Sequence, residues 1–161
     1  MKARGRTSSP PWRLAVLTTA VVVASVAAVA SAAPFPAQHF SLVSVEGEPL
    51  QAGFVEVIHP DGPQIYARHV YQLSGARSDQ SYDVVISIWT SRLDCSELPT
   101  FVLPVAVLVT NATGNGHADV VHAPELLAAL GIRGLTIGGV VTLFRQGTPA
   151  YTTGCKVIQL D

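Results

Sequence analysis

The stretch that most constrains the fold is FVLPVAVLVTNATGNGHADVVH, residues 101–122. Residues 105–109 are apolar and rich in valine, which suits a largely buried strand. Four of the six residues 111–116 are Asn or Gly, the residue types that best tolerate a positive φ. The stretch therefore predicts two strands joined by a tight turn, the second short enough to pair back on the first.

The first 32 residues have the three parts of a secretory signal peptide. Four basic residues precede an uncharged stretch over residues 14–30, and Ala30-Ser31-Ala32 is a small-x-small cleavage signal. We expect cleavage after Ala32, with cleavage after Ala30 as the second choice and an uncleaved membrane anchor as the alternative. The prediction is a signal peptide over 1–32 and a single secreted domain over 33–161.

Removing the signal peptide changes the charge of the chain. It takes away four of the ten basic residues and none of the eleven acidic ones, which leaves six against eleven, a formal charge of −5. The six remaining basic residues are scattered along the sequence. Nucleic acids and anionic lipids require clustered Lys and Arg. We therefore expect neither nucleic acid nor, after cleavage, a membrane as a partner.

The rest of the chain alternates between strand-like runs and turn residues. It predicts eight short strands, over residues 38–46, 53–59, 64–73, 82–90, both halves of 101–122, 136–145 and 150–160. One or two helical turns are expected within 123–134, where Pro124 suits the first turn and Gly131 the C-terminal cap. This helix is too short to cover an apolar sheet face, so the sheets have to cover each other. The pattern predicts an all-β fold, a two-sheet antiparallel Greek-key (immunoglobulin-like) sandwich with one short crossover helix, and a small barrel is the alternative.

Two cysteines in an exported chain predict one disulfide, between Cys95 and Cys155. The bond would close a loop of about 60 residues and contribute roughly 4 kcal/mol. Two free thiols are the alternative, and the wide spacing does not match a redox-active Cys-x-x-Cys pair. We expect Cys155 within the last strand.

A metal site is the second hypothesis from the residues. His117 and Asp119 are two residues apart on a strand and share a face, while His122 points to the opposite face. A metal ion needs three or four converging ligands, so histidines of other strands (His39, His59 and His69) would have to join them. This reading makes the chain a metal-binding protein, superoxide dismutase-like or otherwise protective against oxidative stress. The His-x-His of copper–zinc superoxide dismutase is absent from the sequence.

The remaining side chains offer few candidates for catalysis or binding. The sequence holds no Gly-x-Ser-x-Gly motif and no phosphate-binding glycine loop, so we expect no enzymatic activity and no cofactor. Trp89 is the one tryptophan outside the signal peptide. A place in the core is the preferred prediction for it, but exposed beside Tyr66 and Phe144 it would mark a binding patch.

Residues 139–161, together with the TNATGNGHA segment before them, resemble small exported β-sandwich proteins of actinobacterial type, whose function is unknown. The Leu-x-Gly-Ala corner at residues 73–76 is similar to that of chordin-type domains, although their His-x-His-Gly segment is absent. The resemblance implies the sandwich fold and carries over no catalytic residue. We expect a secreted, disulfide-stabilised, non-catalytic protein of the cell envelope or extracellular space. Its partner would be a protein or an envelope ligand, bound through a sheet face or a loop end.

Overall fold

The computed structural model describes residues 37–58 and 67–160. The predicted signal peptide, His59 and Tyr66 lie outside the described residues. The elements in this part of the chain are β1 (Ala37–Ser41), β2 (Val43–Ser44), β3 (Ala52–Ile58), β4 (Ala67–Ser74), β5 (Ser81–Trp89), β6 (Phe101–Val109), β7 (Gly116–His122), α1 (Pro124–Ala129), β8 (Thr136–Arg145), β9 (Thr148–Thr152) and β10 (Lys156–Gln159).

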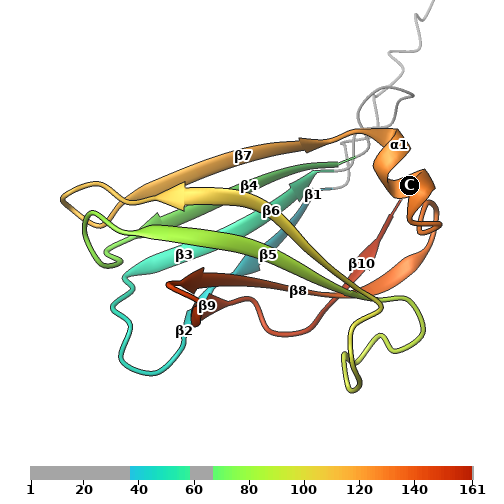
Figure 1. Ribbon diagram of the computed structural model, residues 1–161, viewed down its shortest axis with the longest axis horizontal. Helices are drawn as coiled ribbons and strands as arrows, with labels where there is room; N and C mark the ends of the chain where they lie inside the picture. Colours follow the sequence, from blue (N-terminus) through green and yellow to red (C-terminus); the bar gives the residue numbers. More distant parts are fainter. Residues whose placement is uncertain (1–36, 59–66, 161) are drawn as a thin grey trace, which may run out of the picture. The chain divides into compact units, whose positions relative to one another are not determined.

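The strands form two antiparallel sheets that pack together, as Figure 1 shows. The four-stranded sheet has the order β1-β3-β4-β7. The six-stranded sheet has the order β2-β9-β8-β5-β6, with β10 also paired to β8. The predicted all-β sandwich is confirmed. β8 returns beside β5 after the chain has passed through β6 and β7, which is a Greek-key connection. The immunoglobulin-like variant of the fold stays a prediction.

The turn between β6 and β7 forms as predicted, but the pairing of the two strands was predicted wrongly. Asn111 N–H donates to the Asn115 carbonyl at 2.9 Å, and Gly114 has a φ of +75°. Beyond one isolated bridge between Thr110 and Gly116, β6 pairs with β5 and β7 pairs with β4. The chain changes sheets at this corner, because the apolar side of each strand faces the core from opposite layers.

Two strands that we expected to be continuous are divided. The chain bends at Leu42, whose N–H donates to the Gly53 carbonyl at 2.8 Å, so β1 and β2 belong to different sheets. The last strand is interrupted by residues 153–155, between β9 and β10. Cys155 therefore lies just before β10 and not within a strand, which corrects our expectation. At this break a side-chain oxygen, Thr153 Oγ1, accepts the hydrogen bond from the backbone N–H of Val141, at 3.0 Å.

The apolar core lies between the inner faces of the two sheets. Tyr82, Val84, Ile86 and Ile88 of β5 are buried, as their alternation predicted, and pack with Val55 and Tyr71 of the opposite sheet. Helix α1 adds Leu127 to this core. The chain leaves α1 through Gly131, whose φ of +65° matches the predicted C-terminal cap.

The predicted disulfide is confirmed. Cys95 and Cys155 are bonded, with Cα atoms 5.9 Å apart and a sequence separation of 60. The bond ties the loop after β5 to the segment before β10. A structural disulfide suggests an oxidising environment such as the extracellular space. Within the described residues, none of the helical structure is long and apolar enough to span a membrane.

Candidate ligand-binding cavity

The two ends of the sandwich have different chemistry. Tyr82 and Ile88 lie six residues apart on β5, about 20 Å along the strand. Near Tyr82, side chains of Glu48, Arg77, Arg145 and Tyr151 gather, and we call this the polar end. Near Ile88, α1 and β10 cover an apolar cavity, and we call this the apolar end.

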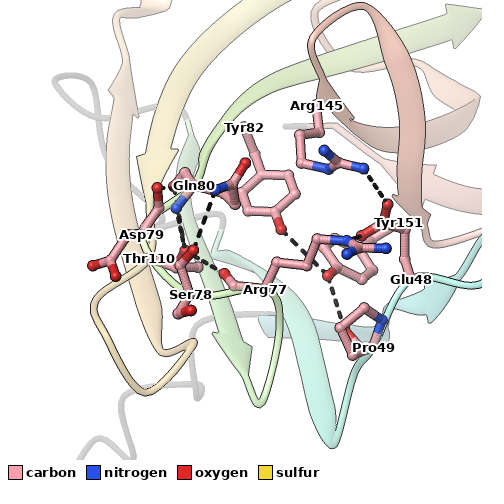
Figure 2. A network of polar contacts seen from close by, with 10 residues as sticks. All are labelled: Glu48, Pro49, Arg77, Ser78, Asp79, Gln80, Tyr82, Thr110, Arg145 and Tyr151. Carbon is pink, nitrogen blue, oxygen red and sulfur yellow. Dashed lines mark hydrogen bonds and ion pairs between the residues drawn. The ribbon is translucent and has the colours of Figure 1, made fainter.

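Glu48 is the centre of the polar end (Figure 2). Its side chain is only 9% exposed and accepts hydrogen bonds from Arg145 at 2.7 Å and Arg77 at 2.8 Å. Burial by itself would raise the pKa of the Glu48 carboxyl, but the hydrogen bonds and charges of Arg145 and Arg77 lower it overall. Glu48 is therefore ionised at neutral pH and joins the end of β8 to the β4–β5 loop.

Further hydrogen bonds complete the polar end in Figure 2. Tyr151 Oη donates to the Pro49 carbonyl at 2.9 Å. Tyr82 Oη lies 3.5 Å from Tyr151 Oη. Burial raises the pKa of the Tyr151 hydroxyl, which keeps it protonated. Thr110 Oγ1 donates to the Arg77 carbonyl at 2.7 Å, which ties the β6–β7 corner to the β4–β5 loop. These contacts fix loops to strands, a structural role.

The apolar end contains a cavity of about 50 Å³ between the sheets. Side chains from both sheets, from α1 and from the end of the chain line it: Ala67, His69, Ile86, Ile88, Leu103, Val105, His122, Leu126, Leu127, Ile132, Ile137, Ile158 and Leu160. α1 and β10 lie at this same end of the sandwich in Figure 1. The disulfide lies beside β8. A Cβ placed on Gly138, which follows the lining residue Ile137, would lie 3.2 Å from Cys95 Sγ.

Two histidines bring polar atoms into this apolar lining. His69 of β4 and His122 of β7 have ring centroids 4.7 Å apart, with the rings inclined at 70°. His69 Nδ1 lies 3.1 Å from Tyr71 Oη, within hydrogen-bond distance. His122 is 9% exposed, and its Nε2 is buried without a hydrogen-bond partner. Burial lowers the pKa of the His122 imidazole, so the ring is neutral at pH 7.

Small-molecule sites share this chemistry, since they are mainly apolar and contain a few placed polar groups, but they are several times larger. The size restricts the ligand. A cavity needs roughly 15 Å³ to hold one water, and an apolar cavity of about 150 Å³ accepts benzene. At about 50 Å³ the cavity has room for only a few heavy atoms, so a longer chain or a ring would require α1 to move.

The candidate metal ligands that lie in the described part of the chain do not gather in one site. His117 and Asp119 share the outer face of β7, as predicted, and His122 faces inward. Asp119 accepts a hydrogen bond from Arg68 Nε at 3.0 Å, and this contact lowers the pKa of its carboxyl. His39 packs against Phe54, with ring centroids 4.6 Å apart. Across the described residues, no group of three or more His, Cys, Asp or Glu is placed to hold a metal ion.

The residues proposed as a binding patch are also apart. Trp89 is 8% exposed and donates from Nε1 to the Glu97 carbonyl at 2.8 Å, so it is buried, but it is not among the core residues between the sheets, where we had placed it. Phe144 pairs with Asp83, whereas Trp89 pairs with Gly138. These two pairs are six residues apart along β5, about 20 Å. Tyr66 lies outside the described residues.

An exposed apolar surface follows the outer side of β6. Val102, Val107 and Val109 are 56%, 58% and 62% exposed. β6 lies at the end of its sheet in the strand order, and Pro104 interrupts its row of backbone N–H donors. Proline on an edge strand is one way in which proteins prevent another chain from adding to the sheet.

The histidine pair at the apolar end was not anticipated, because our metal hypothesis centred on His117. Alternation in the sequence already placed His69 on the same side of its strand as Ala67 and Tyr71, both of which are buried. It also placed His122 opposite to His117. The missing information was the pairing of β4 with β7, in which Ala67 lies opposite His122.

Comparisons of the chain with protein-family models, with curated proteins and with solved structures find no match. The fold and the site define the class instead, a disulfide-stabilised β-sandwich with an apolar cavity at one end.

Proposed function

We propose that this chain is an exported, non-catalytic binding protein whose ligand is a small, slender aliphatic molecule held in the cavity under α1. The observation that carries the proposal is the cavity itself, in which apolar side chains from two sheets surround two neighbouring imidazoles. Interiors of proteins are close-packed, and a buried imidazole nitrogen without a hydrogen-bond partner, such as His122 Nε2, is unfavourable for stability alone. A bound ligand would fill the cavity and would supply a hydrogen-bond partner for the buried imidazole nitrogen.

The covering of the cavity supports ligand access. Helix α1 has six residues, of which Leu127 is buried. The segment after it passes through Gly131 and Gly134, both with positive φ. A short element with few buried contacts opens at a lower free energy than the sheets around it. α1 is therefore the part of the wall that we expect to move when a ligand binds.

The test is a titration with 1-chloropentane, followed by methyl NMR of the isotopically labelled mature protein. We expect saturable shifts at the methyl groups of Leu127, Ile137 and Ile158. In the variant Ala67→Val, two additional methyl groups occupy the cavity, and we expect the affinity to fall by at least about tenfold. The matched control Ala128→Val adds the same atoms on the exposed side of α1 and should bind as the wild type does.

Thermal unfolding of both variants would show that they are folded. Two outcomes would contradict the proposed function. In the first, the shifts are absent or do not saturate at the cavity methyl groups. In the second, the shifts are confined to the exposed valines of β6, which would make that strip the binding surface.

A further inference from the structure

We propose that the ligand of this cavity is a primary aliphatic alcohol whose hydroxyl group forms a hydrogen bond with His122 Nε2. The inference rests on the proposed function and names the chemical class of the ligand. It starts from the one buried histidine nitrogen that has no hydrogen-bond partner among the described residues.

The position of His122 makes it the polar anchor of the cavity. The side chain lines the cavity together with aliphatic groups, and residue 122 is 9% exposed. Its neighbour His69 is already engaged, with Nδ1 3.1 Å from Tyr71 Oη. A buried polar atom without a partner is unfavourable, and a ligand that supplies the partner removes this penalty on binding.

The lining also determines the charge of the ligand. Among the described residues, those that line the cavity include no Asp, Glu, Lys or Arg. A carboxylate or an ammonium group buried there would lack an ion-pair partner, which is strongly unfavourable. Burial of His122 favours its neutral form, so the imidazole does not supply a counter-charge. A neutral ligand is favoured.

Among neutral groups, a hydroxyl fits best. It both donates and accepts hydrogen bonds, so it matches His122 whichever tautomer the ring adopts. An ether or a carbonyl group would match only the tautomer that carries hydrogen on Nε2. The small volume favours an unbranched chain, with the hydroxyl at its end so that the carbon atoms follow the aliphatic lining.

The experiment compares pentan-1-ol with 1-chloropentane, two probes of similar length that differ in hydrogen bonding. For the wild-type mature protein we expect pentan-1-ol to bind about fivefold more tightly, the effect of one net hydrogen bond. The variant His122→Phe keeps a planar ring without the nitrogen, and we expect it to lose the preference for pentan-1-ol, because the buried hydroxyl then has no hydrogen-bond partner. The control His117→Phe makes the same change on the outer face of β7 and should retain the preference. The ¹⁵N resonance of His122 Nε2 should shift with the alcohol and not with the chloroalkane.

The outcomes separate this inference from the proposed function. If both probes bind at the cavity with equal affinity and the Nε2 resonance does not respond, the hydroxyl contact is refuted and the binding function stands. If His122→Phe retains the preference for the alcohol, the inference also fails. If neither probe binds in the cavity, both the inference and the proposed function are wrong.

Discussion

The polar end and the apolar end close the same sandwich in two different ways. At the polar end, Glu48 joins Arg77 and Arg145, and two tyrosines lie beside this ion-pair network. At the apolar end, the Cys95–Cys155 bond joins the loop after β5 to the segment before β10, and the six-residue helix α1 contributes to the cavity lining. The polar end uses directional contacts between side chains, whereas the apolar end uses one covalent bond and a small helix.

The difference shows where this fold can accommodate a ligand. Hydrogen bonds at the polar end position each side chain, so a ligand there would have to displace existing partners. At the apolar end the walls are held by hydrophobic contacts, which are not directional. The disulfide ties the loop after β5 to the segment before β10, and α1 is the cover that we expect to move. Four predictions test this contrast.

The largest effect is expected from the disulfide at the apolar end. In the double variant Cys95→Ala, Cys155→Ala, the loop of about 60 residues is no longer closed. We expect stability to fall by about 4 kcal/mol, which for a domain of this size lowers the melting temperature by on the order of 15 °C. Calorimetry of the oxidised wild type and of the variant measures this. Equal melting temperatures would show that the bond does not stabilise the domain.

At the polar end, Glu48→Gln should lower stability by about 2 kcal/mol, because it leaves two arginines without their carboxylate. The matched control is Asp119→Asn, which removes the partner of Arg68 at the exposed surface, where the Asp119 side chain is 34% exposed. We expect little change there, since exposed ion pairs contribute little. Urea unfolding compares the two. A control as destabilised as Glu48→Gln would remove the distinction between the sites.

At the apolar end, His122 Nε2 is buried without a hydrogen-bond partner, so we expect its substitution to raise stability instead of lowering it. His122→Phe replaces an imidazole whose buried Nε2 has no hydrogen-bond partner by an apolar ring beside a cavity with room for it. We expect stability at pH 7 to rise by about 1 kcal/mol. The same urea measurement tests this, and a clear loss of stability would mean that His122 makes a favourable contact in the unliganded protein.

The smallest effects are changes of stability with pH. We expect the two ends to lose stability in different pH ranges. The pKa of His122 is lowered by burial, so the unfolded chain binds a proton first as the pH falls below about 6.5, and stability decreases there. The pKa of Glu48 is also lowered overall, so its contribution is present at neutral pH and is lost below about 4.5. Unfolding measured from pH 8 to 3 should lose the first step in His122→Phe and the second in Glu48→Gln. An unchanged profile in either variant would contradict its assignment.

Several features of the fold could be predicted from the sequence because they depend on neighbouring residues. The alternation in β5 identified Tyr82, Val84, Ile86 and Ile88 as core residues, since side chains of a strand alternate between its faces. The Asn- and Gly-rich segment predicted the turn after β6. The cap at Gly131 depends on the conformational freedom of a single residue. Only two cysteines are present, so the pairing of Cys95 with Cys155 had a single solution.

Only the tertiary structure decided which strands lie side by side. The sequence predicted that β7 follows a turn, but β7 pairs with β4 and leaves β6 after one bridge. That pairing places His122 beside His69, and the covering by α1 and β10 makes the cavity. Local residue patterns determine the faces of strands, whereas the register between strands distant in sequence depends on how the two sheets together bury their apolar sides.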